Sequence, residues 1–177
     1  MRERIVATPS RFASILPYLA PSLIETILAD PELLTPVVKR SAGAILLADI
    51  AGFTALTETM AQSGPEGLEK LTRWLNAWFD RVIGQIEEQG GEVVKFGGDS
   101  LTAFFRTAEG RLDLAAHRAY RAAEAMQRAV ADWPFVETAG ERASLGMRIG
   151  IGAGGAVAMC VGGLLGRREY VVAGDAV

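Results

Sequence analysis

Residues 92–105 read Glu-Val-Val-Lys-Phe-Gly-Gly-Asp-Ser-Leu-Thr-Ala-Phe-Phe and decide the fold. β-Branched and aromatic residues dominate 92–96 and 101–105, which is the composition typical of β-strands. The four residues between these runs, Gly97-Gly98-Asp99-Ser100, have the length and the glycines of a tight hairpin turn. The stretch therefore predicts two antiparallel strands with Asp99 at the turn that joins them.

The segment before this hairpin predicts one strand and one long helix. The apolar run 44–48 stops at Asp49, as expected for a buried central strand. Ser63 and Glu66 have the spacing of a capping box and mark a helix start, and the glycine pair at 90–91 ends that helix. Apolar residues recur along it at helical spacing: Leu68, Leu71, Leu75, Trp78, Phe79, Val82 and Ile86.

After the hairpin the pattern predicts a helix over 111–133 and strands over 144–153, 156–161 and 169–173. The first two of these strands are expected to turn at Gly154 and Gly155. The resulting β-α-β-β-α-β order is ferredoxin-like: an antiparallel sheet with its first strand in the middle and both long helices on one face. We therefore expect an α+β fold with extra C-terminal strands, in which Asp49 and Asp99 lie close together.

The N-terminal part is expected to form a separate lead-in. Residues 10–38 carry apolar side chains at helical spacing, broken by prolines, and predict short amphipathic helices. We divide the chain into a helical lead-in at 1–40 and a main domain at 41–177.

Composition excludes some partners. The chain has 18 Lys and Arg against 21 Asp and Glu, spread along its length, and offers no basic surface for nucleic acid. Its single cysteine, Cys160, excludes an internal disulfide, and apolar neighbours predict a buried, reduced thiol. These features favour a cytoplasmic location.

Residues 149–166 are uncharged and long enough to raise the question of a membrane span. Seven of these 18 positions are glycine, which favours a buried β-hairpin over a lipid-facing helix. The proline-broken N-terminus shows no export signal. We expect no membrane partner.

Two aspartates carry the candidate chemistry. Carboxylates that converge on one side of a sheet repel each other unless cations lie between them. Their hard oxygens favour Mg²⁺, which keeps waters and substrate phosphates in its shell. Asp49 and Asp99 therefore predict a two-metal site for phosphoryl chemistry. On its own, Asp49 is better explained as a helix N-cap, and the second aspartate on a glycine turn favours the metal site.

The segment after the first aspartate predicts a phosphate site. Ala51-Gly52-Phe53-Thr54 leads into a helix, whose backbone N–H groups and positive end attract phosphate, and Gly52 permits close approach. Lys95 stands four residues before Asp99 and can reach the same cleft to contact a base or another anion. A lone lysine of this kind is more often a solvated strand residue.

Four blocks in sequence order resemble the class III adenylyl and guanylyl cyclases. They are Leu-Leu-Ala-Asp-Ile-Ala-Gly-Phe-Thr at 46–54, Val-Lys-Phe-Gly-Gly-Asp at 94–99, Arg-Ile-Gly-Ile at 148–151 and Glu-Tyr-Val-Val-Ala-Gly-Asp-Ala-Val at 169–177. The resemblance covers about residues 43–177. Phe96 and the proline-broken lead-in are similar to the soluble, bicarbonate-responsive subgroup, in which two cyclase domains often stand in tandem.

The resemblance implies an activity and roles for residues. It implies a head-to-tail dimer, with a second copy or a tandem domain, that converts ATP to cyclic AMP and pyrophosphate at the interface. Asp49, Ile50 and Asp99 match the metal-binding positions for two Mg²⁺ or Mn²⁺ ions. Lys95 and Val171 match two base-contacting positions, and lysine at the first is associated with ATP.

Two features depart from the family pattern. Val171 stands where aspartate or threonine is usual, and its side chain cannot hydrogen-bond adenine. The chain ends at Val177, before the family's ribose-binding asparagine and transition-state arginine, so we expect an incomplete domain that is nearly inactive alone. In tandem enzymes the first domain resembles a metal-donating half, where Lys95 would face a regulatory site.

Two other functions remain open. Val171 is compatible with a non-catalytic, cyclase-like regulatory domain that binds nucleotide or bicarbonate, although retention of both aspartates favours the enzyme. The turn Gly97-Gly98-Asp99-Ser100 also resembles the Gly-Gly-Asp-Glu-Phe turn of diguanylate cyclases. Ser100 in place of glutamate, and Gly52-Phe53-Thr54 after the first aspartate, argue against that reading.

Overall fold

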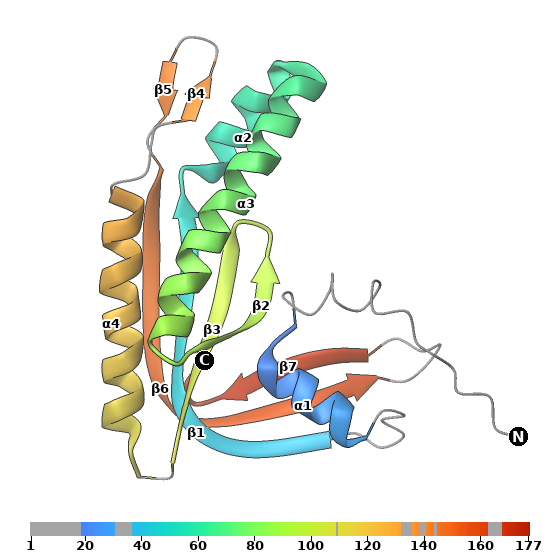
Figure 1. Ribbon diagram of the computed structural model, residues 1–177, viewed down its shortest axis with the longest axis vertical. Coiled ribbons are helices and arrows are strands. Elements are labelled where there is room, and N and C mark those ends of the chain that lie inside the picture. Colours follow the sequence, from blue (N-terminus) through green and yellow to red (C-terminus); the bar gives the residue numbers. More distant parts are fainter. Residues whose placement is uncertain are drawn as a thin grey trace, which may run out of the picture.

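The structure, a computed structural model, describes residues 19–30, 37–108, 110–131, 136–138, 141–143, 145–162 and 168–177. Its elements are labelled in Figure 1. In chain order they are α1 (Pro21–Ala29), β1 (Val37–Ala51), α2 (Phe53–Gln62), α3 (Gly64–Glu88), β2 (Glu92–Gly97), β3 (Ser100–Thr107), α4 (Leu112–Ala131), β4 (Val136–Thr138), β5 (Glu141–Ala143), β6 (Gly146–Gly162) and β7 (Arg168–Gly174).

Five strands form one sheet in the order β2-β3-β1-β6-β7, and all neighbours in it are antiparallel. β1 lies in the middle and pairs with β6 along its whole length. Without β7, this is the strand order of a ferredoxin-like sheet. The predicted α+β fold with an added C-terminal strand is therefore confirmed. β4 and β5 form a separate two-stranded sheet.

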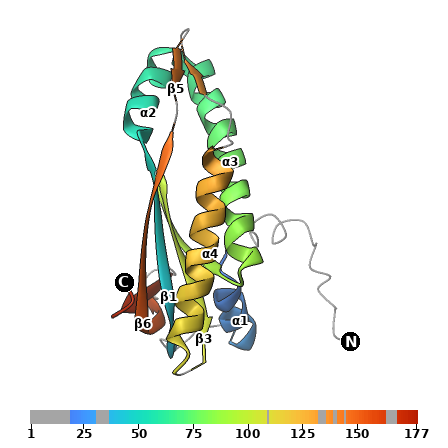
Figure 2. The same cartoon turned by 90° about the vertical axis from the view of Figure 1, so that its left-hand side faces the viewer.

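Alternate residues of β1 face two different layers, because successive side chains of a strand point to opposite faces. Ala44, Leu46, Ala48 and Ile50 are buried with residues of α3 and α4 in the main core. Ile45 faces the other side and packs with Phe104, Ala156 and Ala176. Figure 2 shows α3 and α4 side by side along the sheet. Both long helices thus cover one face, as the topology predicts.

The apolar stripe of α3 is confirmed except at its first residue. Leu71, Trp78, Val82 and Ile86 are buried. Leu68, expected in the same stripe, is 49% exposed. The residue that faces α2 is Gly67, where an added Cβ would lie 2.2 Å from the carbonyl oxygen of Met60. Close contact of the two helices therefore turns Leu68 toward solvent.

α3 begins where the Ser-x-x-Glu spacing predicts, but the capping box itself does not form. Ser63 is at once the C-cap of α2 and the N-cap of α3, with φ −81° and ψ 5°, and its side chain makes no capping hydrogen bond. An N-cap side chain needs extended backbone to reach the first turn. Glu66 pairs with Lys70 instead, at 3.1 Å.

The predicted turn at Gly154 and Gly155 is wrong, because β6 continues through both residues. Gly154 pairs with Gly43 and Gly155 with Ala42 of β1. The chain reverses between β6 and β7, which pair from Ala156 onward. An added Cβ at Gly154 would lie 3.2 Å from the Cβ of Asp175. Gly152 and Gly154 therefore mark close packing of Asp175 and Ala176, which follow β7, and not a turn.

β7 covers only the second half of β6. Within the described ranges, the outer edge of β6 from Gly146 to Gly155 has no strand beside it. One side chain does reach this edge, since the Gln127 amide of α4 donates to the carbonyl oxygen of Met147 at 2.9 Å. The buried thiol expected for Cys160, next to β7, is confirmed.

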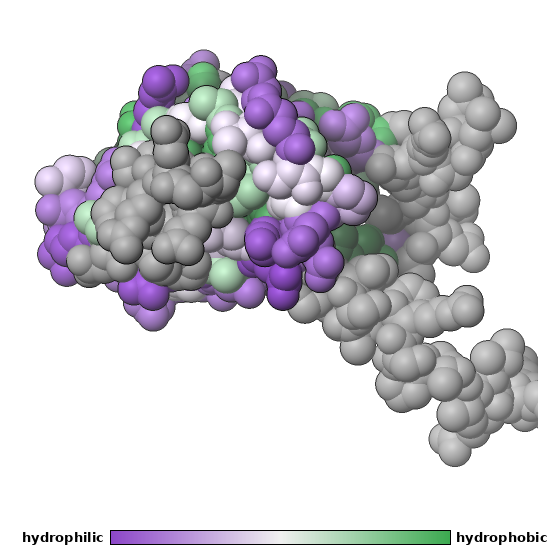
Figure 3. Space-filling model, turned by 90° about the horizontal axis from the view of Figure 1, so that it is seen from above, coloured by the Kyte–Doolittle hydropathy of each residue, from purple (hydrophilic) through white to green (hydrophobic). Residues whose placement is uncertain are grey.

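α2, the first turns of α3 and the β4–β5 hairpin extend past one end of the sheet (Figure 1). A small core of Leu56, Met60 and Leu71 joins α2 to α3 there. Seen from above, this end shows mainly hydrophilic and neutral residues with smaller hydrophobic areas between them (Figure 3). No helix among the described residues is long and apolar enough to cross a membrane.

α1 lies within the region of predicted helices at 10–38, of which residues 10–18 and 31–36 lie outside the described residues. It contacts Lys39, Glu92 and Tyr170. By their register these three residues share the face of Ile45 and Phe104. α1 therefore packs on the face of the sheet opposite to α3 and α4.

Candidate functional site

β1 and β3 place Asp49 and Asp99 at neighbouring positions. Asp49 lies opposite Ser100, and the N–H of Ile50 donates to the carbonyl oxygen of Asp99 at 3.2 Å. Both aspartates are partly exposed. Their backbones therefore meet at one end of the sheet although 50 positions separate them in the sequence, as the topology predicts. Since Ala48 and Ile50 are buried beneath the helices, Asp49 faces the opposite side of the sheet.

A two-residue turn holds Asp99. Gly97 pairs with Ser100, so that Gly98 and Asp99 form the turn, and Gly98 has φ +68°. A residue with a side chain is strained in this left-handed region, which explains the glycine. The hydroxyl of Ser100 donates to the carbonyl oxygen of Gly97 at 2.9 Å and closes the turn. The predicted tight hairpin is confirmed.

The segment expected to bind phosphate lies at the start of α2. Ala51 ends β1, and Gly52 caps the helix with φ 91°. No side chain of the described residues caps this end, and no acidic residue lies in its first turn. The first N–H groups of the helix, from Phe53 and Thr54 onward, are thus left for an anion, which the helix dipole also favours. This end of α2 lies four residues from Asp49 in the sequence.

Two rows of residues cross the face that carries Asp49. One row runs Gly97, Ser100, Asp49, Arg148, and the next runs Lys95, Thr102, Leu47, Gly150. Lys95 is exposed, Leu47 is 46% exposed, and an added Cβ at Gly150 would meet nothing within 4 Å. We call these eight residues the open face. Lys95 thus shares a face with Asp49, one row away.

Arg148 is a site residue that sequence reasoning did not single out. It lies directly opposite Asp49 on β6 and is exposed. Side chains at such paired positions have Cβ atoms about 5 Å apart, so the guanidinium of Arg148 is within reach of a group bound at Asp49. In the sequence, Arg148 is noted only as the first residue of the family block at 148–151. Its position depends on pairing between strands that lie almost 100 residues apart.

Val171 does not lie in either row of the open face. It lies on β7 opposite Met159 of β6, which pairs with Val38 of β1, so by register Val171 is on the opposite face of the sheet from Lys95. The curl of the sheet nevertheless brings β2 and β7 into contact. Val94 and Val172, the neighbours of Lys95 and Val171, pack against the same small core. The two residues expected to contact a base therefore come from strands that approach each other.

The oxygen ligands that the chain offers fit a metal ion that takes most of its other ligands from water and substrate. The described residues contain no cluster of three or more His, Cys, Asp or Glu side chains. Asp49 and Asp99 supply carboxylate oxygens, while the Ile50 side chain is buried and leaves only its backbone carbonyl oxygen as a ligand. Mg²⁺ is commonly held by one or two carboxylates together with substrate phosphates and water. The residues present fit that pattern.

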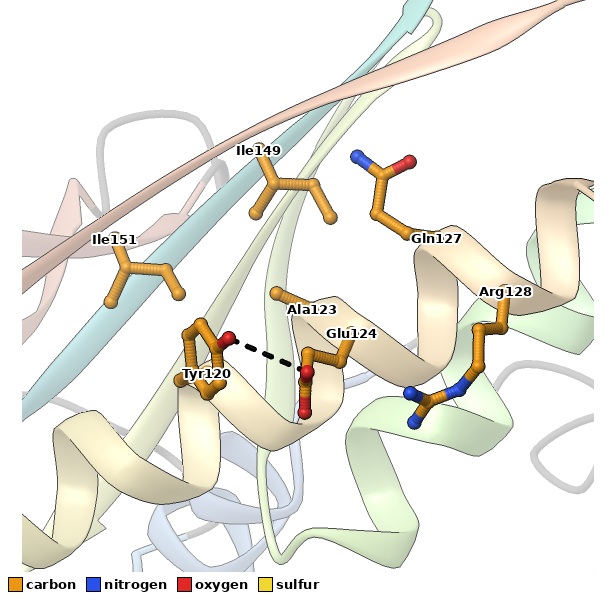
Figure 4. Close-up of a pocket in the computed structure, with 7 residues that line it drawn as sticks. All are labelled: Tyr120, Ala123, Glu124, Gln127, Arg128, Ile149 and Ile151. Atoms are coloured by element: carbon orange, nitrogen blue, oxygen red, sulfur yellow. Dashed lines mark hydrogen bonds between the residues drawn. The ribbon is translucent and has the colours of Figure 1, made fainter.

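A groove of about 450 Å³ lies on the other side of the sheet, between α4 and β6 (Figure 4). Ile149 and Ile151 form its floor, and the Tyr120 hydroxyl donates to Glu124 at 3.4 Å on its rim. Ile149 packs against the main core, so the groove opens on the helix-covered face. It is therefore separate from the open face that carries Asp49.

Comparison with known protein families agrees with the strands and turns described above. Residues 38–177 match the family described as the adenylate and guanylate cyclase catalytic domain. The chain belongs to this family. The resemblance predicted from the four sequence blocks is confirmed.

Particular relatives are adenylate cyclases. The chain is 30% identical to mouse adenylate cyclase type 10 over 155 residues, which cover 80% of this chain and 9% of that protein. It is 34% identical to the adenylate cyclase of Anabaena cylindrica over 179 residues, which cover 99% of this chain and 31% of that protein. The chain thus spans less than a third of the length of either relative.

A solved structure supports the fold. A bacterial light-regulated adenylyl cyclase superposes with a TM-score of 0.70 over 93% of this chain and 45% of that chain, at 23% sequence identity. At this identity the similarity establishes the shared fold alone.

Proposed function

We propose that this domain forms cyclic AMP and pyrophosphate from ATP by two-metal-ion catalysis, for intracellular signalling. The observation that carries the proposal is the pairing of Asp49 with the turn of Asp99, next to the uncapped start of α2. Carboxylates beside a phosphate-binding helix end suit a metal-bound polyphosphate. The adenylate cyclases among the relatives support ATP as the substrate.

Each part of the site has a role in this proposal. The carboxylates of Asp49 and Asp99 and the carbonyl oxygen of Ile50 hold two Mg²⁺ or Mn²⁺ ions, which supply Lewis acidity to the 3′-hydroxyl and to the leaving polyphosphate. The N–H groups of residues 51–54 bind phosphate oxygens. Arg148, exposed beside Asp49, offers a planar guanidinium to the polyphosphate.

The base is assigned to the second row of the open face. Lys95 donates to the base or binds another anion, such as bicarbonate, and Gly150 leaves room beside Leu47. The Val171 side chain donates no hydrogen bond, so selection of adenine falls to Lys95. The site is completed by a second cyclase domain, either another copy or a tandem partner, which covers the open face.

The proposal also covers organisation and location. The expected division puts the catalytic unit at 41–177 and the lead-in at 1–40; since β1 begins at Val37, the catalytic unit begins there and the residues before it form the lead-in. A cytoplasmic location, where ATP is supplied and Cys160 stays reduced, belongs to the same proposal.

The test measures cyclic AMP formed from Mg-ATP and Mn-ATP by the full-length natural protein. Asp49→Asn and Asp99→Asn are each expected to lower kcat by about 100-fold or more, because a neutral amide no longer holds the ions. Asp80→Asn, on the exposed side of α3, is the matched control and is expected to leave kcat unchanged. Wild-type turnover in both site variants contradicts the proposal.

Val171 favours a second candidate function, a regulatory domain that binds nucleotide or bicarbonate without turnover. The distinguishing measurement is binding of a fluorescent ATP analogue alongside the assay. Binding that depends on Lys95, with no cyclic AMP formed at any protein concentration, supports the regulatory function over the enzyme.

A further inference from the structure

α1 is bonded to both edge strands of the sheet through one residue. The backbone N–H of Ser22 donates to the carboxylate of Glu92 at 2.9 Å, and the Ser22 and Tyr170 hydroxyls lie 2.7 Å apart. Glu92 belongs to β2 and Tyr170 to β7, at opposite ends of the strand order. Ser22 therefore links two strands that three others separate in the sheet.

The attachment of α1 is polar and buried. Ser22 and Thr26 are only 4% and 5% exposed. The Thr26 hydroxyl donates to the carbonyl oxygen of Ser22 at 2.8 Å and accepts from Nζ of Lys39 at 2.9 Å. Leu28, by contrast, is 75% exposed and adds little packing. Directional bonds to β1, β2 and β7 thus hold α1 in one position, because buried polar groups strongly favour keeping their partners.

The linked strands are those that carry the proposed base contacts. Lys95 follows Glu92 by three residues on β2, and Val171 follows Tyr170 directly on β7. β2 and β7 touch because the sheet curls, and their contact is limited. β2 also has an irregular register between Val93 and Lys95. The position of Lys95 on β2 therefore depends on what holds these edges together.

We propose that α1 is a strap that fixes the spacing of β2 and β7 and so positions Lys95 of β2 for the base. Ser22, Glu92 and Tyr170 are positioning residues in this arrangement, since they act through the strands and do not touch the nucleotide. The inference rests on the proposed function, in which Lys95 contacts the base. Loosening the strap weakens nucleotide binding and leaves the metal-dependent step intact, because Asp49 pairs with Ser100 and the turn of Asp99 is closed by Gly97 and Ser100, which the strap does not contact.

Tyr170→Phe tests the strap by removing one hydroxyl. In the full-length protein we expect KM for ATP, and the Kd of a fluorescent ATP analogue, to rise by about 5-fold, the equivalent of one lost hydrogen bond, with kcat within about 2-fold of wild type. The preference for ATP over GTP is expected to fall in the same variant. Tyr120→Phe is the matched control, since its hydroxyl donates to Glu124 on the surface of α4, and all three values should stay at wild type.

Glu92 provides a second variant with a conservative rescue. Glu92→Ala removes the acceptor of the Ser22 N–H and is expected to raise KM as Tyr170→Phe does. Glu92→Gln keeps an acceptor oxygen at the same place and is expected to restore KM to within about 2-fold of wild type. Loss of the ion pair with Arg106, 3.5 Å away, is common to both variants, so the difference between them reports the bond to α1.

The outcomes separate the strap from the proposed function. If the wild type forms no cyclic nucleotide, the proposed catalytic function fails, and the Kd series still decides the strap. If the wild type turns over and Tyr170→Phe keeps the wild-type KM and Kd, the strap is overturned. A fall in apparent kcat that matches a loss of folded protein by circular dichroism, with KM unchanged, also overturns it, because that result reports stability and not positioning.

Discussion

Asp49 and Arg148 illustrate how neighbouring residues determine the chemistry of a single side chain. The burial of Ala48 and Ile50 sets the phase of β1, and this phase turns Asp49 away from the helices. That orientation was predictable, because it depends on local alternation in the sequence. The position of Arg148 opposite Asp49 was not predictable, because it depends on the register of β1 against β6. Local patterns do not encode a register between segments so far apart.

The first residue-scale prediction concerns Arg148. Arg148→Gln is expected to raise KM for ATP by about 10-fold, because one charged hydrogen-bond donor to the polyphosphate is lost. Arg121→Gln, on the exposed side of α4, is the control for loss of charge alone. Steady-state kinetics at fixed free Mg²⁺ provide the measurement. Equal KM values in the two variants would remove Arg148 from the site.

A second residue-scale prediction concerns alkaline pH. Burial raises the pKa of the Tyr170 phenol above its ordinary value of 10.0, although the hydrogen bond with Ser22 acts in the opposite direction. A raised folded-state pKa means that the folded protein holds this proton more tightly than the unfolded chain. The stabilisation is fully present below pH 10 and is lost as pH rises through the folded-state pKa.

Urea denaturation at pH 8 and at a pH just above 10 measures this effect. The free energy of unfolding of the wild type is expected to fall more between the two pH values than that of Tyr170→Phe, which has no phenol to ionise. Identical losses in both proteins would show that another group is responsible.

At the scale of elements, patterns within one segment were predictable and packing between segments was not. The central strand, the hairpin and both long helices follow local periodicity, and the structure confirms each of them. The continuity of β6 was missed because its glycines look like turn signals, whereas Gly154 is needed where Asp175 packs on the strand. The bonds of α1 to two distant strands also leave no trace in the local sequence.

One element-scale prediction compares two glycines. Gly43→Ala in β1 places a Cβ 2.5 Å from both the Phe104 ring and the carbonyl oxygen of Phe105, and we expect a loss of about 1–3 kcal/mol in the free energy of unfolding. Gly84→Ala in α3 meets nothing within 4 Å, and we expect a gain of about 0.5–1 kcal/mol from helix propensity. Chemical denaturation of both variants checks the pair. A stable Gly43→Ala protein would contradict the described packing of β1 and β3.

At the scale of the molecule, one face of the sheet packs in the large core and the other carries the candidate site. Its helix-covered face holds the large core, with Trp78, Met126 and the buried residues of β1. Its other face carries the strap at one end and the open face at the other. A site that one domain leaves uncovered agrees with the proposed arrangement, in which a second cyclase domain completes it.

Mixing two inactive variants tests whether that second domain is another copy of this chain. Asp49→Asn lacks the metal role and Lys95→Ala lacks the base role, so each protein alone is expected to be inactive. When each site takes its metal ligands from one protomer and its base contact from the other, half of the dimers in a 1:1 mixture have one fully intact site of two, and about a quarter of wild-type activity should return. No recovery, with both variants folded, would show that the two roles of one site do not come from two copies of this chain.

The outer edge of β6 from Gly146 to Gly155, which has no paired strand among the described residues, has a consequence for handling the protein. A row of backbone groups without a neighbouring strand is a template on which another chain can add, and the usual defences are charge and poor strand-forming residues. Arg148 and the glycines at alternate positions supply both within this stretch. Replacing them with β-branched residues would make the domain prone to fibrous precipitation as its concentration rises.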